Sequence, residues 1–202
     1  MGGQNLEMPD DRNEYLQRVA QFVEGIVDGR DPDLAAHQSS VEKLAAALGK
    51  AIGCSREDIR ILSIGAQLHD IGKMSLSENI LHKPGRLTTS EYSLVKQHSE
   101  LGHQLLSPLS LDPRIPNIVR FHHENYDGTG YPSGLSKTDI PIFARIIRIV
   151  DSFDALTKDR PYHLGLPKDK VLQLLQNDSR LYDPDILEAF CRTASNGRRP
   201  KE

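Results

Sequence analysis

The sequence is poor in aromatic and sulfur-containing residues. It has no tryptophan, aromatic residues make up 5% of its 202 positions, and its two cysteines are Cys54 and Cys191. Two cysteines this far apart, each among apolar residues, argue against a disulfide framework and favour a reducing compartment. The core must therefore be mainly aliphatic.

Long apolar runs and a strong net charge are also missing. No run approaches the ~20 apolar residues that a membrane-spanning helix needs, and the first residues lack the profile of a secretion signal. The formal net charge of −3 argues against non-specific binding of nucleic acid. We therefore expect a cytoplasmic protein that binds neither membrane nor nucleic acid. A phosphorylated substrate stays allowed, because metal ions or a local basic cluster can neutralise it.

Apolar residues recur at helical spacing along most of the chain, and no convincing β pattern or internal repeat is present. We predict an all-α protein with its main domain at residues 31–195. A tail and one helix in residues 1–30 precede this domain, and a basic tail in residues 196–202 follows it. The first helix, at residues 13–27, either caps the domain or ends a signalling helix of a longer protein.

Local signals place several further helices. An Asp-Pro pair at residues 31–32 opens one helix, and a capping box of Thr88 and Glu91 opens another that we expect to continue to residue 106. Between these helices, residues 74–86 are expected to form an irregular connection. Another helix begins after residues 139–141, and Asp183 is the expected N-cap of the last one.

Polar residues interrupt the apolar faces of these helices. His37 shares a face with Val41 and Leu48, and Asp33 lies one turn earlier on that face. For these two residues alone, an interfacial histidine and a first-turn carboxylate favoured by the helix dipole are the favoured account. His98 lies on a predicted stripe with the leucines at 94, 101 and 105, whereas His103 lies off it and is expected at the surface.

Two adjacent pairs carry a more specific signal. His69 and Asp70 end a helix, where the aspartate can bridge two metal ions, and Lys73 offers a cation close by. The other pair, His122 and His123, ends an apolar run and leads directly into a glycine-rich turn.

One buried histidine is usually structural, but five on separate core-facing segments are hard to satisfy without metal. The set is too large for one tetrahedral zinc and lacks thiolates. We therefore expect two or three divalent metal ions with mixed nitrogen and oxygen ligands, iron or manganese being favoured. The residues found in this way are His37, His69, Asp70, His98, His122, His123 and Asp151.

Long motifs resemble a known family. HDIGK at residues 69–73 and HHENYDGTGYP at residues 122–132 are similar to the HD-GYP subgroup of the HD-domain phosphohydrolases. The resemblance continues through ILHKPGRLT (80–88), IPIFARIIRIVDSFDAL (140–156), DRPY (159–162) and YDPDILEAF (182–190), and it covers about residues 31–193.

The resemblance implies an HD-domain helical bundle around a di- or trinuclear metal centre. The implied activity is hydrolysis of cyclic di-GMP to pGpG, which often continues to GMP in this family. By the family pattern all seven residues above match metal ligands, with Asp70 bridging. Asp33 lies where some members use a glutamate to hold a third metal, but its side chain is one methylene shorter. Lys73, Tyr131 and Arg160 match substrate-contacting positions, and we expect Asp70 and Lys73 to be catalytic. Where many members have a further basic residue after RPY, this chain has His163 and Leu164.

The expected mechanism uses two metal ions ~3.5–4 Å apart that hold a hydroxide in line with the phosphorus. Lys73 and Arg160 would bind the phosphate oxygens. In the glycine-rich turn, Asp127 is expected to hold the loop by hydrogen bonds, and Glu124 to support His122 or His123.

Two other functions compete with hydrolysis of cyclic di-GMP. The protein could be an HD hydrolase of another nucleotide, or a catalytically weak module that binds the nucleotide and signals through a protein partner. The expected binding partner is cyclic di-GMP. The sequence also allows a sensory or signalling partner protein and self-association into an oligomer.

Overall fold

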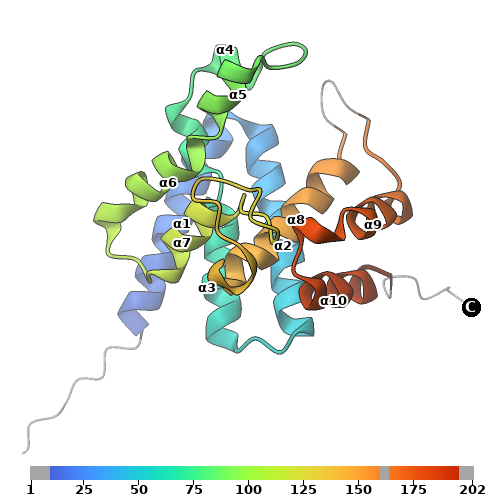
Figure 1. The fold of residues 1–202 in the computed structure, drawn as a ribbon. Coiled ribbons are helices and arrows are strands. Elements are labelled where there is room, and N and C mark those ends of the chain that lie inside the picture. Colours follow the sequence, from blue (N-terminus) through green and yellow to red (C-terminus); the bar gives the residue numbers. More distant parts are fainter. Residues whose placement is uncertain (1–9, 160–163, 196–202) are drawn as a thin grey trace, which may run out of the picture.

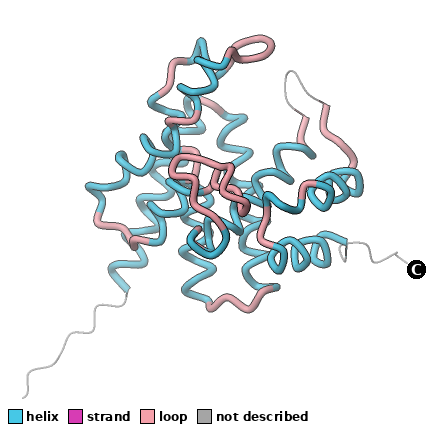
Figure 2. Tube along the Cα trace, viewed as in Figure 1, coloured by secondary structure: helices cyan, strands magenta, loops and turns pink. Residues whose placement is uncertain are grey.

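The protein is a helical bundle in a computed structural model that describes residues 10–159 and 164–195. These ranges contain no strand, so the prediction of an all-α protein is confirmed (Figure 2). The α-helices, as labelled in Figure 1, are α1 (Asp10–Arg30), α2 (Pro32–Ala51), α3 (Arg56–Leu68), α4 (Glu78–Leu81), α5 (Thr89–Val95), α6 (His98–Leu106), α7 (Arg114–Phe121), α8 (Ile142–Thr157), α9 (Lys168–Asn177) and α10 (Pro184–Ser195). Short 3-10 helices are η1 (Ile71–Ser75), η2 (Ser107–Leu109), η3 (Lys137–Asp139) and η4 (Ser179–Leu181).

The aliphatic core lies where α2 packs against α3 and α8. Leu48, Leu62 and Ile147 are fully buried there, one from each of these helices. Burying a side chain of this size stabilises the fold by about 1.5–3 kcal/mol. The chain between α7 and α8, gold in Figure 1, has little regular structure and crosses the front of this core.

Helix α1 packs along α2 and α3 and contributes Leu16, Ala20 and Val27 to the same core. It therefore belongs to the bundle, which is compatible with both readings of this segment. The domain boundary after residue 30 stays a prediction. No helix among the described residues is both long enough and apolar enough to cross a bilayer.

The prediction of one helix over residues 88–106 is wrong. The capping box of Thr88 and Glu91 is present, but the helix it starts, α5, ends at Val95, and α6 begins at His98. Leu94 and Leu105 are 42% and 47% exposed, so they do not form the expected apolar stripe. Helix α6 buries His98, Ser99, Gly102 and Leu106 instead.

Close approach of backbones explains which face of α6 is buried. A Cβ atom on Gly72 in η1 would lie 1.8 Å from the carbonyl oxygen of His98, and one on Gly102 would lie 2.7 Å from Val119. These glycines let η1 and α7 pack directly on α6. Gly72 thus permits a short packing distance, which sequence periodicity does not report.

Residues 74–86 are also more regular than predicted. They include the end of η1 and the short helix α4, which buries none of its side chains. Helices α4 and α5 lie at the top of the molecule in Figure 1, away from the core. The last helix, α10, begins directly after Asp183, which accepts hydrogen bonds from the N–H groups of Asp185 and Ile186 as the expected cap.

The packing predicts the effect of adding a methyl group at two glycines. Gly72→Ala should lower the free energy of unfolding by about 3 kcal/mol, because its Cβ meets backbone atoms that cannot rotate away. Gly25→Ala is the matched control: its Cβ meets nothing within 4 Å on α1, and alanine favours a helix by up to about 1 kcal/mol. Urea denaturation of both variants tests this, and equal stability of the two would contradict the packing argument.

Candidate metal centre

The predicted histidines and aspartates converge from separate helices on one buried region. His37 lies on α2, His69 and Asp70 follow α3, His98 begins α6, His122 and His123 follow α7, and Asp151 lies on α8. Several of these side chains stand at helix ends, where the chain changes direction and a side chain can point along the axis of its helix.

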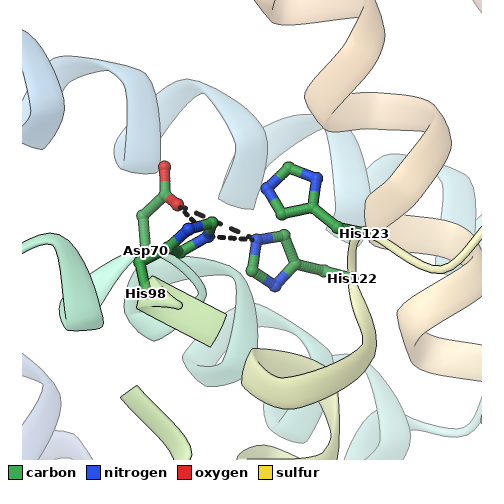
Figure 3. A group of neighbouring side chains, drawn as sticks. All are labelled: Asp70, His98, His122 and His123. Atoms are coloured by element: carbon green, nitrogen blue, oxygen red, sulfur yellow. Dashed lines mark hydrogen bonds and ion pairs between the residues drawn. The ribbon is translucent and has the colours of Figure 1, made fainter. Parts of the chain in front are cut away.

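Two groups of potential ligand atoms share one residue. Asp70, His98, His122 and His123 form one group, drawn in Figure 3, in which the ligand atoms lie within 4.8 Å of one another. His37, His69 and Asp70 form the other group by the same measure. We call these the three-histidine group and the two-histidine group.

The two oxygens of Asp70 face different groups. Oδ1 lies 3.2 Å from Nε2 of His98 and 3.8 Å from Nε2 of His122. Oδ2 lies 3.4 Å from Nε2 of His69 and 4.0 Å from Nε2 of His37. A carboxylate that bridges two metal positions needs this arrangement, with one oxygen for each position.

Backbone carbonyls set the orientation of three histidines. Nδ1 of His69, His98 and His122 lies 2.6, 2.7 and 2.8 Å, respectively, from the carbonyl oxygen three residues earlier. A carbonyl oxygen only accepts hydrogen bonds, so each Nδ1 must carry the proton. Each Nε2 in the neutral ring is then an unprotonated lone pair, which is the form that binds metal.

Unsatisfied polar atoms in this region fit a cation. Nε2 of His69 and Oδ1 of Asp70 are buried without a hydrogen-bond partner among the described residues. Nε2 of His98 lies 3.2 Å from Nε2 of His122, so two lone pairs face each other. Two nitrogens that bind one metal at ~2.1 Å each stand roughly 3 Å apart. The cluster can therefore bind metal, and its atoms are poorly satisfied otherwise.

Burial and neighbouring charges set the protonation of the cluster. Burial lowers the pKa of His122 to about 4 and lowers the pKa of His123 well below its usual value. Burial opposes ionisation of Asp70, but the charge of the neighbouring Lys73 ammonium outweighs it and holds the pKa of Asp70 well below its usual value. At neutral pH two histidines are thus neutral and the bridging carboxylate is charged, as metal binding requires.

His37 is held between two carboxylates of α8. Its Nε2 lies 3.0 Å from Oδ1 of Asp151, and its Nδ1 lies 2.7 Å from Oδ2 of Asp154. Burial lowers the pKa of His37, but these two hydrogen bonds outweigh it and raise the pKa to about 9. Oδ1 of Asp151 also lies 4.0 Å from Nε2 of His69, so Asp151 flanks the two-histidine group.

Sequence reasoning missed Asp154 and Ser40. Asp154 is buried, and its other oxygen accepts a hydrogen bond from the Ser40 hydroxyl. A signal was present, because Asp154 follows Asp151 by three residues in α8 and therefore lies on the same face. The partner of Asp154 was not visible, since His37 lies 117 residues earlier.

The remaining predicted site residues have different settings. Asp33 is exposed and belongs to neither group. Nζ of Lys73 lies 2.5 Å from Oδ2 of Asp70 and is partly exposed. The ring of Tyr131 stacks on His123 with centroids 4.8 Å apart, and burial raises its pKa, so the phenol is neutral. Arg160 and His163 lie outside the described residues, and the roles of all these residues stay predictions.

The glycine-rich turn brings Tyr131 to the cluster. A Cβ atom on Gly130 would lie 2.3 Å from the backbone nitrogen of Asn125, so the turn can close this tightly only with glycine there. The N–H of Tyr131 then donates to the carbonyl of His123. This backbone bond places the tyrosine ring over the histidine ring.

Two acidic residues hold the same turn. Asp127 accepts hydrogen bonds from the N–H and hydroxyl of Thr129 and pairs with Arg180 at 2.7 Å, as its expected structural role requires. Glu124 does not follow the expectation that it supports a histidine. Its Oε1 accepts from the N–H of Ser133 at 2.7 Å, because the turn folds back over it.

The raised pKa of His37 predicts a pH-dependent stability of the metal-free protein. Because the pKa in the folded state, about 9, lies above the ordinary 6.5, the stabilisation by the imidazolium is present below pH 6.5 and is lost as pH rises through 9. The shift corresponds to a loss on the order of 3 kcal/mol. Urea denaturation in chelator from pH 6 to 10 should show this loss in the wild type and in His103→Asn but not in His37→Asn. An unchanged profile in His37→Asn would contradict the assignment.

Comparisons with a family model and with curated proteins point to the same family. The family model described as HD domain matches residues 21–186. The cyclic di-GMP phosphodiesterase response regulator RpfG of Xanthomonas campestris is 35% identical over 189 residues, which are 92% of this chain and 49% of that protein. The 3'3'-cGAMP-specific phosphodiesterase 3 of Vibrio cholerae is 36% identical over 177 residues, 87% of this chain and 38% of that protein. This chain thus spans half or less of the length of these relatives.

A solved structure shares the fold. The HD domain of the phosphodiesterase PgpH from L. monocytogenes, in complex with cyclic-di-AMP, aligns with a TM-score of 0.65 over 89% of this chain and 99% of that domain. At 18% identity this likeness concerns the fold alone. The family model covers most of the chain and the relatives exceed 30% identity, which confirms the resemblance drawn from the motifs: this chain belongs to the HD domain family.

Proposed function

We propose that this protein is a metal-dependent phosphodiesterase that hydrolyses cyclic di-GMP to pGpG or GMP. The observation that carries the proposal is the buried Asp70 carboxylate, whose two oxygens face two separate groups of imidazole nitrogens. Two metal positions joined by one carboxylate suit the cleavage of a phosphodiester. Curated relatives named cyclic di-GMP phosphodiesterases support the choice of substrate.

Each metal position would be held by residues of this chain. Asp70 with His98, His122 and His123 would hold one, and Asp70 with the two-histidine group and Asp151 would hold the other. We propose two positions rather than three, because Asp33 is exposed and belongs to neither group. The mixed nitrogen and oxygen donors without thiolate favour iron or manganese. When bound, the ions supply charge neutralisation of the phosphate and a nucleophile activated at neutral pH.

The chain itself binds and orients the phosphodiester. Lys73 is partly exposed beside Asp70, so its ammonium can donate to a non-bridging phosphate oxygen while it stays close to the bridging carboxylate. Tyr131 is held over His123 by the glycine-rich turn and offers a neutral phenol and an aromatic face to the nucleotide. Arg160 is proposed to add bidentate contacts to phosphate.

A second candidate substrate has a specific observation in its favour. Relatives named 3'3'-cGAMP-specific phosphodiesterases are as similar to this chain as those named for cyclic di-GMP. The two dinucleotides share the phosphodiester backbone and differ in one base, so the metal centre does not distinguish them. Base contacts at the rim of the site would make the choice.

Product analysis after incubation with each dinucleotide tests the proposal. Protein prepared anaerobically and loaded with iron or manganese should convert cyclic di-GMP to pGpG or GMP. Cleavage of 3'3'-cGAMP alone would instead establish the second substrate. Tight binding of either dinucleotide without any product from a fully metallated sample would identify a binding module and exclude the proposed activity.

The bridging position of Asp70 predicts a coupled loss. Asp70→Ala should remove an oxygen ligand from both metal positions, and the fall in metal affinity should exceed the ~10–100-fold typical of losing an outer hydrogen-bond partner of a ligand. Metal analysis and turnover should fall together, while far-ultraviolet circular dichroism stays helical. Asp28→Ala on the exposed face of α1 is the control. Full metal content in Asp70→Ala would show that the ligand assignment is wrong.

A further inference from the structure

His37 is oriented differently from the other histidines of the cluster. His69, His98 and His122 each donate their Nδ1–H to a neutral backbone carbonyl close in sequence. Nδ1 of His37 instead meets the carboxylate of Asp154 at 2.7 Å, across the interface between α2 and α8. A carboxylate is a stronger hydrogen-bond acceptor than a carbonyl, because it carries a full charge.

The Asp154 carboxylate is fixed on both oxygens. Oδ2 bonds His37, and Oδ1 accepts from the hydroxyl of Ser40, which lies one turn further along α2. Asp154 is 1% exposed, so solvent does not compete for these bonds. Asp151 lies one turn earlier on the same face of α8. The two aspartates therefore contact one ring nitrogen of His37 each, Asp151 at Nε2 and Asp154 at Nδ1.

We propose that Asp154 is a positioning residue for one of the two metal positions. It would hold the Nδ1–H of His37, aim Nε2 towards Asp70, and make that nitrogen a stronger donor to metal. A carboxylate behind a metal-binding histidine acts in this way in other metal sites. The inference rests on the proposed metal-dependent function only in requiring that the cluster binds metal.

The proposal makes the two metal positions unequal. Asp70 is shared, but Asp151 and Asp154 both stand on the side of the two-histidine group. The three-histidine group has backbone carbonyls behind His98 and His122. The two-histidine group should therefore bind a divalent cation more tightly, and loss of Asp154 should weaken this position alone.

A manganese titration of the full chain, followed by calorimetry and by the electron paramagnetic resonance of free Mn²⁺, tests the inequality. The wild type should bind two equivalents with different affinities. Asp154→Asn keeps the volume but removes the charge, and it should weaken the tighter equivalent by about 10–100-fold and leave the other unchanged. Ser40→Ala, which keeps the carboxylate but frees one of its oxygens, should weaken the same equivalent by less.

Asp183→Asn is the matched control for removing a buried carboxylate. Asp183 is 6% exposed and pairs with Arg145 at the start of α10, so its loss costs stability without contact to the cluster. Both manganese equivalents should be unchanged in this variant. Equal weakening of both equivalents by Asp154→Asn, or an unchanged tighter equivalent in both Asp154→Asn and Ser40→Ala, would overturn the proposal.

A second readout uses the metal-free protein and does not depend on turnover. In proton–nitrogen correlation spectra of the histidine rings, the Nδ1–H proton of His37 should resonate further downfield than those bonded to carbonyls. Asp154→Asn should move this resonance alone upfield, and Asp183→Asn should move none of the Nδ1–H resonances of His37, His69, His98 and His122.

If the wild type binds two unequal equivalents but cleaves no cyclic dinucleotide, the proposed function fails and this inference stands. If the His37 resonance does not respond to Asp154→Asn, the inference fails whatever the activity.

Discussion

The candidate site depends on a buried carboxylate that the described residues satisfy only in part. Asp70 is 2% exposed, and Lys73 pairs with its Oδ2 and favours its charged form, but its Oδ1 has no hydrogen-bond partner among the described residues. A buried charge that is only partly paired is costly. In their neutral form, the histidines that donate Nδ1–H to backbone carbonyls add lone pairs rather than donors around Asp70, so the region gains most from a shared cation.

The helix ends deliver the nitrogens to that place. His69 and His122 follow the last residues of α3 and α7, and His98 begins α6, so their rings can bond backbone carbonyls and still point Nε2 inward. The glycine contact between η1 and α6 brings the carbonyl of His98 next to Gly72. Close backbone packing thus sets the spacing of ligands that come from different parts of the chain.

The electrostatics of the two ligand groups differ although they share one aspartate. Carboxylates of α8 stand behind and beside His37, whereas burial keeps His122 and His123 neutral. One metal position would thus be surrounded by more negative charge than the other. Two cations bound at these positions would then have different affinities. Lys73 adjoins this centre beside Asp70, and Tyr131 adjoins it beside His123.

The helical class, the capping box of Thr88 and Glu91, the Asp183 cap of α10 and most residues of the cluster could be predicted from the sequence. These features depend on neighbours within about one helical turn, or on motifs such as HDIGK, and such information is local. The tertiary structure alone decided the break between α5 and α6, the exposure of Asp33 and Leu94, the bond from Ser133 to Glu124, and the pairing of His37 with Asp154. Each of these follows from how closely two segments approach in space, and hydrophobic periodicity within one segment carries no information about that distance.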